Sequence, residues 1–125
     1  MSKCILIADD CGAIRASLRQ FLERELGLEV CGEAVDGVEA VEKAPQIGPD
    51  LVILDLAMPR MNGLQAAREM RKLPINVPII LFTIHSDALQ FSDVESAGIN
   101  AVVAKTNLMG LRQSIQVLLT SDQAN

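Results

Sequence analysis

Short apolar runs that end in a polar residue recur along the chain at regular intervals. The clearest is Leu51–Leu54, four apolar residues that lead directly into Asp55. A run this short and apolar at every position is typical of a strand buried on both faces, as in a parallel sheet. Four further strands are predicted from similar runs, at residues 4–8, 28–34, 78–83 and 101–104.

Between these runs, apolar residues recur with the spacing of amphipathic helices. The helix after the first strand should end at Gly27 and expose Arg15, Arg19, Glu23 and Arg24 to water. Its predicted buried stripe comprises Ile14, Leu18, Phe21, Leu22 and Leu26.

Start and stop signals predict the remaining helices. Asp36 is the expected N-cap of the second, with Glu39 three residues later, and residues 45–49 between two prolines are expected to form a loop. Asn62 and Gly63 should open the third. The fourth should begin at Ser86–Asp87 and has a thin apolar stripe of Ala88, Phe91 and Val94. The fifth is amphipathic, and its apolar stripe comprises Leu108, Leu111, Ile115, Leu118 and Leu119.

Strand and helix therefore alternate five times. This alternation predicts an α/β fold, a doubly wound parallel sheet of five strands with helices on both faces. With 125 residues, of which 50% are hydrophobic, the chain has the size and the apolar content of one domain.

Composition excludes several classes of function. The net charge of -5 argues against direct nucleic-acid binding, which needs a basic face. No apolar run has the length of a membrane span or of a signal-peptide core, so no membrane association is expected. Three cysteines without metal-type spacing predict reduced thiols and a cytoplasmic protein. The absence of Trp and Tyr argues against a flavin site.

Polar side chains follow four of the five predicted strands, namely Asp9–Asp10, Asp55, Thr83 and Lys105. Right-handed crossovers bring the carboxyl ends of parallel strands to one edge of the sheet. Two carboxylates about 4 Å apart repel by roughly 4 kcal/mol at an effective dielectric constant near 20, so the cluster requires a cation or shared protons. Oxygen ligands without His or Cys indicate Mg²⁺. A carboxylate beside Mg²⁺, an ammonium and a hydroxyl is suited to phosphoryl transfer onto Asp55.

From about Cys4 to Leu119 the chain resembles a response-regulator receiver domain of two-component signalling. The matching residues are Asp9–Asp10, Asp55 with Met58–Pro59 after it, Asn62–Gly63, Thr83 and Lys105. The resemblance implies a flavodoxin-like sheet of strand order 2-1-3-4-5. It also implies a single domain, with residues 120–125 as a polar tail or the start of a linker.

The resemblance further implies that Asp55 accepts a phosphoryl group from a sensor histidine kinase and that Thr83 and Lys105 assist. Mg²⁺ would be held by Asp10, Asp55 and the backbone carbonyl of Ala57, with Asp9 acting through water. The signal would pass to a DNA-binding output domain on a longer chain or to a separate effector, and phosphorylation could promote a homodimer. Catalysis is expected only as self-phosphorylation and self-dephosphorylation.

Three positions depart from the family pattern. Thr106 stands where proline usually follows the lysine, so the Lys105–Thr106 peptide bond is expected to be trans. Val102 replaces the common aromatic residue of the fifth strand, and the bulky Ile84 is expected to narrow access to Asp55. His85, the only histidine, is expected to be an exposed loop residue.

Two alternative functions belong to other classes of protein, one an enzyme and the other a docking module. A haloacid-dehalogenase-type phosphatase also forms an aspartyl phosphate, but it has a second aspartate two residues after its nucleophile, where this chain has Cys11 after Asp9. A degenerate receiver that serves as a constitutive docking module is disfavoured by the complete set of acidic residues.

Overall fold

The structure, a computed structural model, describes residues 3–121. Five strands form one sheet in the order β2-β1-β3-β4-β5, and all neighbouring strands are parallel. The strands are β1 (Cys4–Ala8), β2 (Glu29–Ala34), β3 (Leu51–Leu54), β4 (Ile79–Thr83) and β5 (Ala101–Ala104). The predicted doubly wound fold and its strand order are confirmed.

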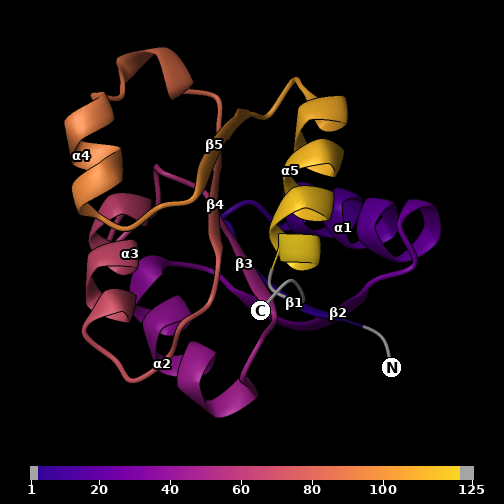
Figure 1. The fold of residues 1–125 in the computed structure, drawn as a ribbon, viewed down its shortest axis with the longest axis horizontal. Coiled ribbons are helices and arrows are strands. Elements are labelled where there is room, and N and C mark those ends of the chain that lie inside the picture. The colour runs from indigo at the N-terminus through magenta and orange to yellow at the C-terminus, as the bar shows by residue number, and fades with distance from the viewer. Residues whose placement is uncertain (1–2, 122–125) are drawn as a thin grey trace.

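Helices cover both faces of this sheet, with α1 and α5 on one face and α2, α3 and α4 on the other (Figure 1). The helices are α1 (Gly12–Gln20), which continues as a π-helix (Phe21–Glu25), α2 (Gly37–Ile47), α3 (Gly63–Arg71), a 3₁₀ turn (Ser86–Ala88), α4 (Phe91–Ser96) and α5 (Leu108–Ser121). The predicted tail therefore begins inside α5, and residues 122–125 lie outside the described residues.

The central strand β3 explains why two layers of helices are needed. Its four apolar residues are all buried, and alternate ones point to opposite faces. Val52 and Leu54 pack with α2 and α3, whereas Leu51 and Ile53 pack with α1 and α5. Each face of the sheet therefore has its own hydrophobic core.

The predicted helix starts at Asp36 and Asn62 are confirmed. The Glu39 amide donates to the Asp36 carboxylate at 2.8 Å. Asn62 and Gln65 form a reciprocal capping box, in which each side chain accepts from the backbone of the other at 2.8 and 2.9 Å. These caps fix where the chain enters α2 and α3, next to the carboxyl edge of the sheet.

Two segments differ from the prediction. The loop predicted at residues 45–49 is confined to residues 48–49, because α2 continues to Ile47 with Pro45 in its last turn and ends at Gly48, which has φ 64°. Proline there removes a single helical hydrogen bond, while Ala44 keeps its place in the core. The helix predicted from Ser86 is interrupted by the extended backbone of Leu89, and the exposed fraction of Phe91 is 77% rather than that of a core residue.

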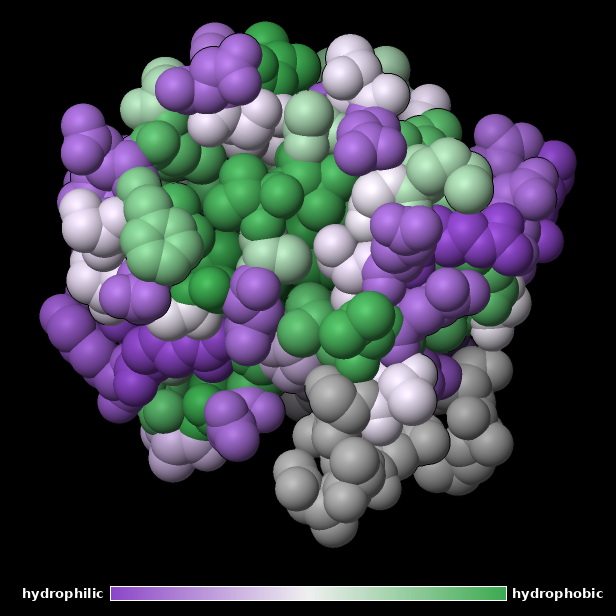
Figure 2. Space-filling view, turned by 45° about the horizontal axis from the view of Figure 1, so that its top comes forward, coloured by the Kyte–Doolittle hydropathy of each residue, from purple (hydrophilic) through white to green (hydrophobic). Residues whose placement is uncertain are grey.

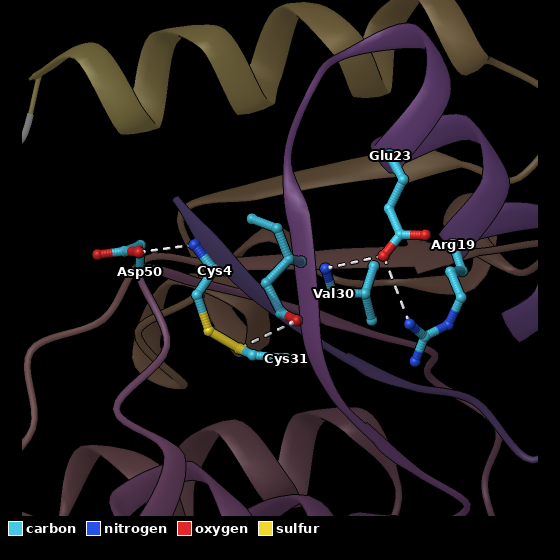
Figure 3. The surroundings of a disulfide bond; sticks show 7 residues. Cys4, Arg19, Glu23, Val30, Cys31 and Asp50 are labelled. Atoms are coloured by element: carbon cyan, nitrogen blue, oxygen red, sulfur yellow. Dashed lines mark hydrogen bonds and ion pairs between the residues drawn. A yellow bond between two sulfur atoms is a disulfide. The ribbon is translucent and has the colours of Figure 1, made fainter. Parts of the chain in front are cut away.

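The predicted reduced state is wrong for Cys4 and Cys31 and is confirmed for Cys11. Cys4 and Cys31 form a disulfide with a Cα–Cα distance of 5.5 Å, while Cys11 is free and exposed (Figure 3). The cause lies in the sheet: the register of β1 and β2 shifts after Ile5, so that Cys31 is an additional residue on β2 beside the start of β1. Such a register shift cannot be predicted from the sequence pattern.

All described peptide bonds are trans, including Lys105–Thr106 as predicted. No helix within residues 3–121 is both long and apolar enough to cross a membrane.

Candidate functional site

The carboxyl ends of β1 and β3 bring three aspartates together. The Asp55 amide donates to the carbonyl of Ala8 at 2.9 Å, and the Asp9 amide donates to the carbonyl of Ala34 at 3.0 Å. One carboxylate oxygen each of Asp9, Asp10 and Asp55 lies within 4.8 Å of the others. The predicted acidic cluster is therefore present.

Lys105, directly after β5, supplies the positive charge of this cluster. Its Nζ lies 2.7 Å from Asp9 Oδ2 and 3.3 Å from Asp55 Oδ1. The Lys105 backbone amide donates to the carbonyl of Thr83 at 3.0 Å, which fixes the lysine against the end of β4. The structure thus places Asp9, Asp10, Asp55, Thr83 and Lys105 at one edge, as predicted.

Burial of this cluster affects the pKa values of Asp55 and Lys105. The exposed fractions of Asp9 and Asp55 are 2% and 6%, whereas Asp10 is exposed. Burial and the nearby charge of Asp9 raise the pKa of Asp55, and Lys105 offsets part of this effect. Burial opposes the charged form of Lys105, but its bond to Asp9 and the charge of Asp55 outweigh burial, so its pKa is raised.

The donors at this edge fit a hard cation such as Mg²⁺. They are carboxylate oxygens, and three carboxylates face one ammonium. Both oxygens of Asp9 already have partners, since Oδ1 accepts from the Cys11 amide at 2.9 Å and Oδ2 binds Lys105. Asp10 and Asp55 are therefore the residues best placed to bind a cation directly.

Thr83 and its neighbours complete the edge. Thr83 is fully buried, and its hydroxyl accepts a hydrogen bond from the His85 amide at 3.0 Å. The His85 side chain is exposed, as expected. Ile84 is 68% exposed, and the narrowing of access to Asp55 that was expected of it stays a prediction. The same holds for the Ala57 carbonyl as a ligand.

The loop between β3 and α3 is held over the site by contacts with α2. The Gly37 amide donates to the carbonyl of Met61 at 3.1 Å, and Arg60 Nε lies 2.7 Å from Asp36 Oδ2. Arg60 adopts a left-handed backbone with φ 65°. A Cβ at Gly63 would collide with the Asp55 carbonyl, so only glycine allows α3 to start this close to the acidic residue.

Two arginines that were predicted to face water bind Glu33 on β2, although the Arg19 side chain remains 41% exposed. Arg15 Nε lies 2.9 Å and Arg19 Nη2 lies 2.7 Å from the Glu33 carboxylate, and Arg15 also donates to the backbone carbonyl of Asp9 at 2.6 Å. Only 18% of the Arg15 side chain is exposed. Helical spacing marks both arginines as off the core, but it carries no information about a partner 14 or 18 residues away on a strand.

Comparison with known proteins agrees with this geometry. The family model of the response regulator receiver domain matches residues 5–116. The chain belongs to the response regulator receiver domain family. This receiver is 36% identical over 105 residues to the chemotaxis protein CheY of Thermotoga maritima, with 84% of this chain and 87% of that protein covered. It is 44% identical over 101 residues to the transcriptional regulatory protein PdtaR of Mycobacterium tuberculosis, covering 81% of this chain and 48% of the regulator.

Other relatives are much longer than this receiver. A protein-glutamate methylesterase/protein-glutamine glutaminase of Pyrococcus abyssi is 46% identical over 80 residues, which are 63% of this chain and only 21% of that protein. Among solved structures, a CheY-like receiver domain protein of Methanospirillum hungatei superposes with a TM-score of 0.87 at 27% identity, covering 99% of this chain and 98% of the other. The matched region of each is the receiver fold.

Proposed function

We propose that the chain is a phosphorylation-controlled signalling switch whose phosphoacceptor is Asp55. The observation that carries this proposal is the position of the Asp55 carboxylate, which is buried to 6% exposure and lies beside Asp9, Asp10 and Lys105. Membership of the receiver family supports the same role.

The chemistry is a transfer between two nucleophiles. An oxygen of the ionised Asp55 carboxylate attacks phosphorus as the bond from phosphorus to the donor's imidazole nitrogen breaks, and the imidazole takes up one proton from solvent, which leaves an acyl phosphate on Asp55 and a neutral histidine on the kinase. Lys105 contributes a positive charge beside Asp55, where negative charge on the equatorial phosphoryl oxygens builds up. The Thr83 hydroxyl, at the end of the neighbouring strand, is the candidate hydrogen-bond donor to the product.

Bound Mg²⁺ would neutralise negative charge on the phosphoryl oxygens and thereby lower the barrier to transfer. We assign its direct protein ligands to Asp10, Asp55 and the Ala57 carbonyl, and a water-mediated role to Asp9. The geometry supports this division, since both oxygens of Asp9 already have a partner in the Cys11 amide and Lys105, whereas the Asp10 side chain is exposed.

We propose a sensor histidine kinase as the phosphodonor. The output is either a further domain, as in the longer relatives, or a separate effector that binds the phosphorylated surface. A phosphorylation-dependent homodimer is one form that this output can take. Methylesterase activity is not part of the proposal, because the match to those relatives covers only 21% of their length.

Intact-mass spectrometry with a small phosphodonor and Mg²⁺ tests the proposal. One phosphoryl group should be added to the wild type and to Asp87→Asn, an exposed aspartate in the 3₁₀ turn that serves as the matched control. None should be added to Asp55→Asn, or to the wild type with excess chelator. Equal uptake by Asp55→Asn and the wild type would refute the assignment.

A further inference from the structure

Arg15 on α1 connects the acidic cluster to Glu33 on β2. Arg15 is the fourth residue of α1, and this helix begins immediately after Asp9, Asp10 and Cys11. One guanidinium nitrogen donates to Glu33 at 2.9 Å and another donates to the backbone carbonyl of Asp9 at 2.6 Å. We infer that Arg15 is a positioning residue that holds the Asp9–Asp10 turn in the geometry needed to bind Mg²⁺; this inference rests on the proposed metal site.

The arginine is itself held firmly. Glu33 binds Arg15 through Oε1 and Arg19 through Oε2, the latter by two bonds at 2.9 and 2.7 Å. The bond to Arg19 lowers the pKa of Glu33, against the effect of burial, and Arg15 adds to the lowering. A carboxylate fixed between two guanidinium groups is a rigid support, because each planar fork restricts its orientation.

The consequence is largest for Asp10. Asp9 is fixed by Ala34, Cys11 and Lys105 as well as by Arg15. Within residues 3–121, no other side chain or amide holds the Asp10 carboxylate. Its direction therefore depends on the backbone of the turn, and the carbonyl of that turn is what Arg15 binds. Groups behind a metal ligand commonly change metal affinity by about 10–100-fold when removed.

The direction in which Mg²⁺ affinity changes when Arg15 is removed distinguishes a positioning role from a purely electrostatic one. A cation near the site repels Mg²⁺, so removal of the Arg15 charge alone would strengthen Mg²⁺ binding. Loss of the bond to the Asp9 carbonyl releases the turn and weakens Mg²⁺ binding. A helix start is also an unfavourable place for a positive side chain, and the contact with Asp9 accounts for its presence there.

Arg15→Met and Arg19→Met form a matched pair. Both remove an arginine that binds Glu33, but only the first removes a contact with Asp9. Calorimetric titration with Mg²⁺ alone should show about tenfold weaker binding for Arg15→Met and close to wild-type binding for Arg19→Met. In metal-free protein, the Cys11 amide should exchange with solvent faster in Arg15→Met than in Arg19→Met.

Arg15→Lys keeps the charge and the aliphatic stem while it loses the fork that joins Glu33 to Asp9, so it extends the test if Arg15→Met folds poorly. Its Mg²⁺ binding should be weaker than that of the wild type, in the same direction as Arg15→Met. Binding equal to or tighter than wild type in the Arg15 variants, with the wild type binding Mg²⁺, overturns this inference alone. A wild type that does not bind Mg²⁺ overturns the proposed metal site and this inference together.

Discussion

Asp55 lies in surroundings that disfavour its ionised form. It is 6% exposed, it neighbours a second buried carboxylate, and one ammonium at 3.3 Å balances part of this charge. The raised pKa follows from burial first and from Asp9 second. Such a carboxylate gains more than an exposed one when a cation or a phosphoryl donor arrives, because its charge is poorly solvated beforehand.

This raised pKa gives a signed expectation for stability. Since the folded state binds the Asp55 proton more tightly than the unfolded chain does, the stabilisation is complete below the ordinary carboxyl pKa and is lost as the pH rises through the folded-state value. Without metal, Asp55→Asn should therefore be more stable than the wild type at pH 7, by about 1 kcal/mol, and the difference should shrink toward about pH 4. Urea denaturation across this range measures it. A gain that instead grows on acidification would contradict the expectation.

Asp10 should separate metal binding from folding. Asp10→Asn removes one of three crowded charges, so the metal-free protein should be slightly more stable, by less than about 1 kcal/mol because the side chain is exposed. The same change should abolish most of the rise in melting temperature that Mg²⁺ causes. Glu95→Gln, an exposed acid on α4, is the control and should keep the full rise. A complete Mg²⁺ response in Asp10→Asn would exclude this residue as a ligand.

The helices α3 and α4 differ sharply in how many of their residues are buried. The helix α3 begins with a capping box and buries Gly63, Ala66, Ala67 and Met70. The helix α4 has six residues, and none of them is buried. Local stability depends on buried contacts, so we expect α4 to open more readily than the other helices of this layer, α2 and α3.

A pair of substitutions tests this contrast. Phe91→Ala should change the free energy of unfolding by less than about 0.5 kcal/mol, because the ring is 77% exposed. Met70→Ala in the core should cost about 2–5 kcal/mol. Native-state hydrogen exchange should show α4 amides exchanging faster than those of α3. A large loss of stability in Phe91→Ala would show that α4 is held by its aromatic residue.

Across the chain, the pattern of apolar and polar residues predicted those features that depend only on local periodicity. The strand Leu51–Leu54, its position in a parallel sheet and the acidic edge follow from short apolar runs with polar ends. The disulfide, the arginine pair on Glu33 and the exposed Phe91 do not, because each depends on register or packing between segments far apart in the chain. Pro45 inside α2 shows the same limit, since tertiary packing outweighed a local breaker.

An exposed apolar surface lies next in the chain to the acidic site. In Figure 2, apolar side chains gather in a hollow on the face that carries α4, β5 and the start of α5. Exposed apolar residues from this part of the chain include Ile84, Phe91, Val102, Leu108 and Met109. Ile84 directly follows the buried Thr83, so a change at the site has a short path to this surface.

A phosphoryl group on Asp55 is expected to change that surface through the loop after β4. Phosphorylation adds about -1.5 to -2 charges and three acceptor oxygens. The Thr83 hydroxyl now accepts from the His85 amide at 3.0 Å, so its rotation toward the new oxygens breaks the bond that holds the loop after β4. Val102 has too few atoms and too stiff a side chain to transmit the change by packing inward as an aromatic residue would, and it is already 36% exposed. We therefore expect the response to run through the loop and α4.

Hydrogen exchange with and without beryllofluoride and Mg²⁺ should change most between Thr83 and Gly98. Thr83→Ala should still accept the phosphoryl group but lose that change, whereas Thr106→Ala, an exposed control, should keep it. A response centred on Val102 and α5, with the loop unaltered, would refute this route.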